Sequence, residues 1–102
     1  MKVPLQSLLL ALILQIGGEY RITDTEGKVN FYLIREALPN GDYVGYSPAR
    51  WLGIKGKGMD IRPSFEYRQD DRWKVVLNPS KIAEVELIGT RPIQKEGQNA
   101  KY

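Results

Sequence analysis

The chain has 102 residues and a formal net charge of +3, with 42% hydrophobic and 26% charged residues, which fits one globular domain and excludes disorder throughout. It contains neither cysteine nor histidine, which excludes disulfides, thiolate metal sites, Ser-His-Asp and Cys-His catalysis and the usual zinc hydrolases. We therefore expect a non-enzymatic protein without a cofactor or a metal.

The first eighteen residues are unusually apolar. Leu8 to Leu14 are consecutive apolar residues, Pro4 suits the first turn of a helix, and Gly17-Gly18 suits its end. The sequence predicts one helix over residues 1–18 that is apolar nearly all round, which implies burial on most sides. The residues expected to contact a protein partner, a second copy or a membrane surface are Leu5, Leu8, Leu9, Leu12, Ile13 and Ile16.

Two other interpretations of this segment stay open. Lys2, the leucine run and the small residue Gly18 also fit a signal peptide that is cleaved, which would make the protein an exported domain. A membrane span is the third interpretation, although the segment is shorter than the roughly 20 apolar residues that cross a bilayer.

Residues 19–90 predict a small, mainly β domain. Apolar and polar side chains alternate in several short segments, which begin near Tyr20, Val29, Tyr43, Phe65, Trp73 and Ala83. Turn residues separate them at Gly27, at Asn40-Gly41, at Asp70-Asp71 and at Asn78-Pro79. We expect a small closed or half-open antiparallel barrel of five or six strands, of the SH3-like, Sm-like or OB-like kind, because closure removes exposed strand edges.

A helix followed by five strands, with an ending from Lys74 to Ile88 that reads as strand, proline-containing turn and strand, resembles the architecture of the Sm-like barrels. The Arg-Gly pair and the histidine-bearing turn typical of those families are missing here. The resemblance therefore implies a fold and carries over no binding residues.

Residues 48–63 interrupt the alternation and predict an ordered loop with a short turn at Pro48–Leu52. Within it, residues 50–62 hold four basic side chains and one acidic side chain, which favours an anionic partner. Basic residues among aromatic rings can contact phosphates while bases stack on the rings. The candidate RNA- or DNA-binding residues are Tyr46, Arg50, Trp51, Lys55, Lys57 and Arg62. In the alternative interpretation the loop is merely solvated, and Trp51 and Leu52 close the bottom of the barrel.

The polar residues 91–102 predict a mobile tail. Taken together, these patterns predict a non-enzymatic binding or assembly module that uses its N-terminal helix to join a protein partner, an oligomer or a membrane surface. A small nucleic-acid-binding barrel that uses loop 47–62 is the alternative, and an exported β domain is a further one. We expect a cytoplasmic location, with membrane association as an alternative and export if residues 1–18 are a leader.

Overall fold

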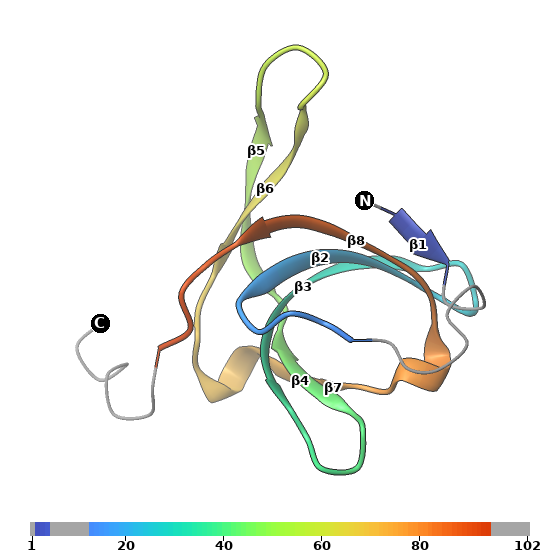
Figure 1. The fold of residues 1–102 in the computed structure, drawn as a ribbon. Coiled ribbons are helices and arrows are strands. Elements are labelled where there is room, and N and C mark those ends of the chain that lie inside the picture. Colours follow the sequence, from blue (N-terminus) through green and yellow to red (C-terminus); the bar gives the residue numbers. More distant parts are fainter. Residues whose placement is uncertain (1, 5–12, 95–102) are drawn as a thin grey trace.

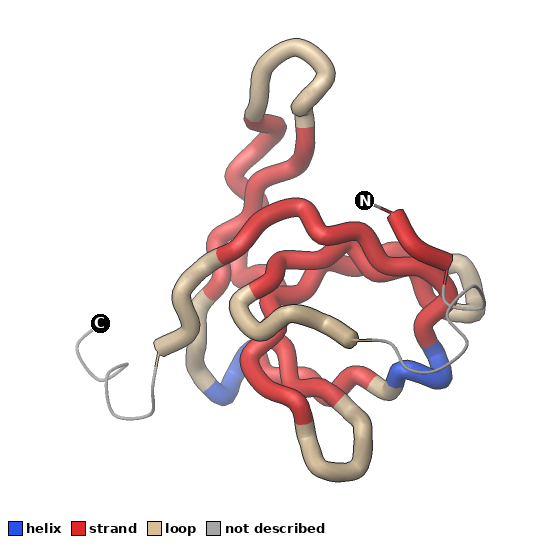
Figure 2. The backbone as a smooth tube through the Cα atoms, in the orientation of Figure 1, coloured by secondary structure: helices blue, strands red, loops and turns tan. Residues whose placement is uncertain are grey.

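A computed structural model describes residues 2–4 and 13–94 of the chain. Its strands are β1 (Lys2–Pro4), β2 (Gly18–Asp24), β3 (Val29–Ala37), β4 (Tyr43–Tyr46), β5 (Pro48–Lys55), β6 (Arg62–Tyr67), β7 (Lys74–Leu77) and β8 (Ile82–Thr90). Two short 3₁₀ helices, η2 (Asp71–Trp73) and η3 (Pro79–Lys81), precede β7 and β8. Strands dominate the described backbone, as Figure 2 shows, and the mainly β prediction is confirmed.

Six strands form one antiparallel sheet in the order β1-β8-β2-β3-β4-β7 (Figure 1). Strands β2, β3 and β4 follow one another directly, and β8 returns to pair with β2, with Val85 opposite Ile22. Strands β5 and β6 form a separate two-stranded sheet between β4 and β7 in the sequence. The large sheet is curved but is not closed into a barrel, so of the two predicted forms, closed and half-open, the closed one is wrong.

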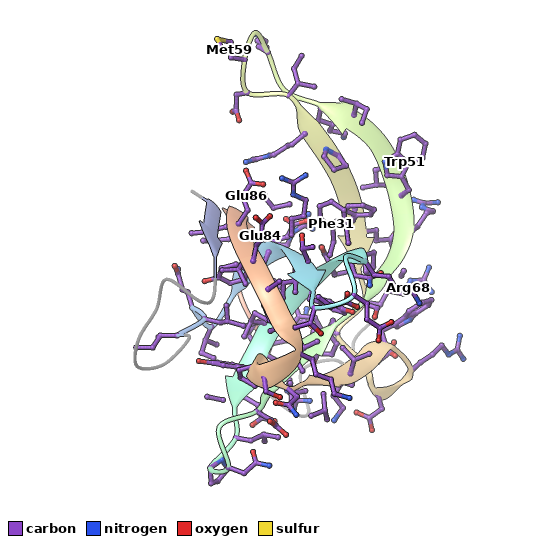
Figure 3. All side chains as sticks on the ribbon, turned by 90° about the vertical axis from the view of Figure 1, so that its right-hand side faces the viewer. Phe31, Trp51, Met59, Arg68, Glu84 and Glu86 are labelled. Atoms are coloured by element: carbon purple, nitrogen blue, oxygen red, sulfur yellow. The ribbon has the colours of Figure 1, made fainter. Side chains whose placement is uncertain are left out.

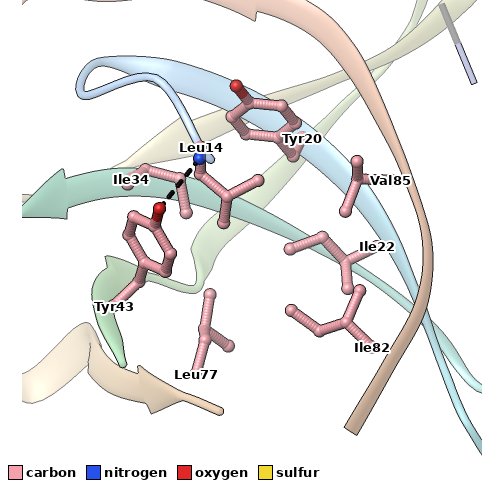
Figure 4. Packing of buried hydrophobic residues seen from close by; sticks show 8 residues of the cluster. All are labelled: Leu14, Tyr20, Ile22, Ile34, Tyr43, Leu77, Ile82 and Val85. Carbon is pink, nitrogen blue, oxygen red and sulfur yellow. Dashed lines mark hydrogen bonds between the residues drawn. The ribbon is translucent and has the colours of Figure 1, made fainter. Parts of the chain in front are cut away.

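The main core cluster lies on one face of the large sheet, where strands β2, β3, β4, β7 and β8 bring apolar side chains together (Figure 4), and Leu33, Val44 and Tyr46 are buried besides it. Its buried members are Leu14, Tyr20, Ile22, Ile34, Tyr43, Leu77, Ile82 and Val85. The two phenols also bind the backbone that enters β2. The hydroxyl of Tyr43 accepts a hydrogen bond from the N–H of Leu14 at 3.0 Å, and that of Tyr20 accepts one from the N–H of Gln15 at 2.8 Å.

The described part of the N-terminal segment is not the predicted helix. Residues 2–4 form strand β1, which pairs with Glu84–Glu86 of β8, and residues 13–17 contain no helix. Contacts with the folded sheet override the local helix preference here, because Leu14 enters the core. Of the predicted contact residues, Ile13 and Ile16 are exposed. The others lie outside the described residues: Leu5, Leu8, Leu9 and Leu12.

The predicted turns are confirmed, with local causes that the sequence contains. Gly41 has φ +96°, a conformation that glycine adopts at low cost, between β3 and β4. Oδ1 of Asp24 accepts the backbone N–H groups of Glu26 and Lys28, at 2.8 and 2.9 Å, between β2 and β3. Oδ1 of Asn78 accepts the N–H of Ser80 and so caps η3 before β8.

One further prediction needs correction. The region predicted as a loop, residues 48–63, is mostly β5 and the start of β6. At the start of the segment predicted as a mobile tail, the N–H of Arg91 donates to the carbonyl of Gly17 at 2.8 Å, and the N–H of Gln94 donates to Oε1 of Gln69 at 2.8 Å. Residues 95–102 lie outside the described part of the chain.

Candidate functional site: the β5–β6 arm

Residues 48–67 form a two-stranded ribbon, which we call the arm, and it projects away from the large sheet (Figure 1). Its register places Trp51 opposite Phe65 and Lys55 opposite Arg62. Two register shifts, after Pro48 and after Trp51, fit the eight residues of β5 to the six of β6. Such bulges twist a ribbon and interrupt the alternation of its faces.

The tip of the arm is a tight turn that requires glycine. Gly56 has φ +120°, and a Cβ atom built there would lie 1.8 Å from the carbonyl oxygen of Asp60. The N–H of Asp60 donates to the carbonyl of Lys57 at 3.0 Å and closes the turn. The side chains of the tip are therefore presented on a defined backbone.

The arm carries half of the large hydrophobic side chains that the described residues expose, five of ten. Trp51 is 61% exposed and lies on the outer side of β5, and Met59 is fully exposed at the tip (Figure 3). The other three are Leu52, Ile54 and Ile61. The interpretation in which Trp51 and Leu52 close the bottom of a barrel is thus wrong. Clusters of exposed apolar side chains are typical of interaction surfaces.

The predicted cations of the arm divide into two groups. Arg50 forms an ion pair with Glu66 at 3.1 Å, and Arg62 donates to the carbonyl oxygen of Ile88 in β8. Lys55 and Lys57 have no ion-pair partner among residues 2–4 and 13–94. Within the arm, the cations without an ion-pair partner therefore lie beside the tip, which also carries the exposed carboxylate of Asp60.

Tyr46, the remaining candidate, does not belong to the exposed surface. It is 1% exposed, and the guanidinium of Arg35 lies 6.0 Å from the centre of its ring. Burial raises the pKa of its phenol, with Arg35 and Lys74 acting in the opposite direction. Tyr46 is thus a buried residue of β4 and offers no exposed ring on which a base could stack.

A second set of contacts fixes the arm to the sheet, and sequence reasoning did not find it. The ring of Phe65 lies 4.7 Å from that of Phe31 in β3. The hydroxyl of Tyr67 donates to Oε2 of Glu19 at 3.0 Å, and Glu19 is only 6% exposed. Burial, followed by the Glu19 carboxylate, raises the pKa of Tyr67. These residues of β6 therefore anchor the arm on β2 and β3.

Arg91 completes this anchor from the end of β8. Its Nη2 donates to the carbonyl oxygen of Phe65 at 2.9 Å, its Nε lies 3.4 Å from Oε1 of Glu19, and its guanidinium covers the ring of Tyr67 at 5.0 Å. One cation thus compensates the buried carboxylate and binds the backbone of the arm. No local sequence signal marks these residues, because they lie far apart along the chain.

The described residues offer no group of three or more His, Cys, Asp or Glu side chains arranged to hold a metal ion. Asp70 and Asp71, which are turn residues as predicted, have other roles: Asp70 caps η2, and Asp71 lies 2.9 Å from the ammonium group of Lys74. Nor does this part of the chain contain a helix that is long and apolar enough to cross a bilayer.

Comparison of the chain with protein-family models, with curated proteins and with solved structures finds no significant match.

Proposed function

We propose that the protein is a non-enzymatic binding module whose arm attaches it to an anionic membrane surface. The observation that carries the proposal is the composition of the tip, where three exposed aliphatic side chains, Ile54, Met59 and Ile61, surround two lysines without a partner among the described residues. A surface that is both apolar and basic suits the boundary between acyl chains and anionic headgroups.

The shape of the arm favours this partner over a protein partner. The arm ends in a projecting turn (Figure 1), so a protein would have to surround it with a matching apolar groove lined with carboxylates, whereas a lipid surface adapts to the tip. Each lysine near an anionic surface contributes about 1 kcal/mol of attraction. A fully buried aliphatic side chain contributes about 1.5–3 kcal/mol. Several such terms together are enough for reversible attachment.

Trp51 lies further from the tip than Met59, on the outer side of β5 (Figure 3). Indole rings favour the headgroup level of a membrane, because they combine an apolar body with a polar N–H. An arm that enters with its tip therefore brings Trp51 toward this level, where the fluorescence of the indole reports on its surroundings.

The test is co-sedimentation of the full chain with vesicles of phosphatidylcholine alone and of phosphatidylcholine with phosphatidylglycerol. We expect binding to the anionic vesicles, with a blue shift of tryptophan emission that the variant Trp51→Phe lacks. Binding should be lost in the triple variant Ile54→Thr, Met59→Thr, Ile61→Thr and weakened in Lys55→Gln, Lys57→Gln. The matched control is Val29→Thr, which removes a half-exposed apolar side chain from the large sheet.

Absence of binding to anionic vesicles would overturn the proposal. Binding that survives the triple variant would overturn the role of the arm. A dimer in light scattering that the triple variant dissociates would assign the tip to a second copy of the chain instead.

A second candidate function is binding of single-stranded RNA or DNA, which the exposed ring of Trp51 favours, close to the cations of β5. In fluorescence anisotropy with labelled oligonucleotides, log affinity should fall with log salt by roughly 0.7 per neutralised phosphate, and Lys55→Ala, Lys57→Ala should flatten this dependence. Trp51→Ala should weaken binding at every salt concentration, by about 1–3 kcal/mol for a stacked base. Failure to bind at low salt would exclude this function.

We also propose that the sheet is a half-open form of the small SH3-like barrel. This rests on the antiparallel order β8-β2-β3-β4-β7, in which the last strand returns to β2, and on the 3₁₀ turn η3 directly before that strand.

A further inference from the structure

A cavity of about 260 Å³ lies away from the arm, where the end of β7 and the turn before β8 face β2 and β3. The chain enters β7 at Lys74, after the arm and η2, whereas the cavity begins at Val76 and Leu77, toward the other end of this short strand. Its lining comes from β2, β3, β7, η3, the first residue of β8 and the connecting turns.

The inner part of the cavity is apolar. Ile22, Leu77 and Ile82 belong to the buried core, and Figure 4 shows their side chains in one region of it. Val76, which alternates with Leu77 on β7, is 64% exposed and adds an apolar wall. A ligand that enters can therefore bury a small hydrocarbon group against side chains that are already fixed by the fold.

The outer part of the cavity offers hydrogen-bond donors. Lys28 and Lys81 are exposed and have no ion-pair partner within the described ranges. Oδ1 of Asn78 accepts both the N–H and the hydroxyl of Ser80, which directs the other end of the amide, an NH₂ donor, away from that turn. The phenol of Tyr32 is a further donor, and burial, followed by the nearby Asp24, raises its pKa.

The charges of the lining limit the ligand. Lys28 and Lys81 against Asp24 leave one net positive charge, which suits a monoanion better than a phosphate dianion. Oδ1 of Asp24 already accepts the backbone N–H groups of Glu26 and Lys28, so this carboxylate is engaged in the turn.

We propose that this cavity binds a carboxylate carried on a compact apolar group, with the carboxylate at Lys28 and Lys81 and the apolar group against Ile22, Leu77 and Ile82. Two sources share this chemistry, namely a free small organic acid and the C-terminal residue of a peptide. Charge-assisted hydrogen bonds hold the carboxylate, and exclusion of water from the apolar wall holds the remainder. The inference is independent of the proposed role of the arm.

The test is an NMR titration of the isotopically labelled full chain with N-acetyl-leucine and with its uncharged carboxamide. We expect saturable shifts of Ile22, Val76 and Ile82 with the acid and much weaker shifts with the amide. Short peptides that end in leucine, with a free or an amidated C-terminus, distinguish the two sources, because a site for chain ends binds the free peptide more tightly than the single acid.

The variant Lys28→Gln, Lys81→Gln should weaken binding of the acid by about tenfold, since it removes both cations that face the carboxylate. The matched control Lys57→Gln removes a lysine of the arm tip and should leave the affinity unchanged. Equal binding of acid and amide, equal effects of the two lysine variants, or no shifts at the cavity would each overturn the proposal. Vesicle binding serves as the second control. The double variant Lys28→Gln, Lys81→Gln should weaken it much less than the double variant Lys55→Gln, Lys57→Gln does.

Discussion

The phenol of Tyr67 donates a hydrogen bond of 3.0 Å to the carboxylate of Glu19, a side chain 48 residues away in the sequence and 6% exposed. This contact joins the arm to the first long strand of the sheet. A buried carboxylate is costly unless its oxygens are paired, and here the two oxygens are divided between Tyr67 and Arg91. The Glu19 carboxylate of the sheet thus needs hydrogen-bond partners, and Tyr67 of the arm supplies one of them.

Replacing Tyr67 with phenylalanine should lower the free energy of unfolding by about 1–3 kcal/mol, because Glu19 loses a hydrogen bond in a buried place. Denaturant unfolding of the wild type and of Tyr67→Phe measures this. The variant Glu19→Gln is a useful companion, since it removes the charge and keeps the shape. An unchanged unfolding midpoint in Tyr67→Phe would show that water replaces the phenol without cost.

Stability should also depend on pH in the alkaline range. The pKa of Tyr67 is raised in the folded state above the value of 10.0 that it has when unfolded. Its contribution is therefore complete below pH 10 and is lost as the pH rises toward the folded pKa, at about 1.4 kcal/mol per pH unit. Unfolding measured at several alkaline pH values should show this decline, and Tyr67→Phe should show a smaller one. Identical slopes would contradict the assignment.

Leu14 and Ile13 offer a matched pair within the apolar N-terminal segment. Leu14 is 3% exposed and belongs to the core, whereas Ile13 is 82% exposed. Leu14→Ala should reduce the free energy of unfolding by about 2–5 kcal/mol, as core truncations do. Ile13→Ala should change it by less than about 0.5 kcal/mol. Equal effects in thermal or denaturant unfolding would mean that residue 14 does not pack as described.

The turn at the tip should tolerate change at one glycine and not at another. Gly56→Ala places a Cβ atom against the carbonyl of Asp60, whereas nothing lies within 4 Å of a Cβ atom at Gly58, whose φ of +61° asparagine also adopts. Gly56→Ala should raise amide exchange along the arm and weaken its binding, and Gly58→Asn should not. Global unfolding should change by less than about 1 kcal/mol in both, because the tip is far from the core. Slow exchange of the arm in Gly56→Ala would contradict this.

Several strands of the sheet could be predicted because apolar and polar side chains alternate along them. Ile22 in β2 and Val85 in β8 are buried between more exposed neighbours, and this alternation is visible in the sequence. The turns at Gly41 and at Asn78 could be predicted for a different reason, because their residues fix the backbone through local conformation and local hydrogen bonds.

The arm and its anchor could not be predicted in this way. Most side chains of β5 are exposed and two bulges shift its register, so hydrophobic periodicity carries no strand signal there. The fold alone brings together Glu19, Tyr67 and Arg91, which lie far apart in the sequence. The sequence around each of them is that of an ordinary strand or tail residue. The N-terminal segment misled the helix prediction because leucine has a high helix propensity, whereas Leu14 is bound by tertiary contacts.

The N–H of Ser47 donates to the carbonyl of Trp73 at 2.9 Å, directly beside the pairing of Tyr46 with Lys74. The chain thus leaves the sheet after Ser47 and returns at Trp73 to an adjacent position. Residues inserted or removed in pairs between Lys55 and Arg62 would change how far the ribbon reaches while the register of β4 with β7 stays as it is. The length of the arm can consequently change by natural variation or by engineering. The sheet would then carry two-stranded ribbons of other lengths and with other residues at the tip.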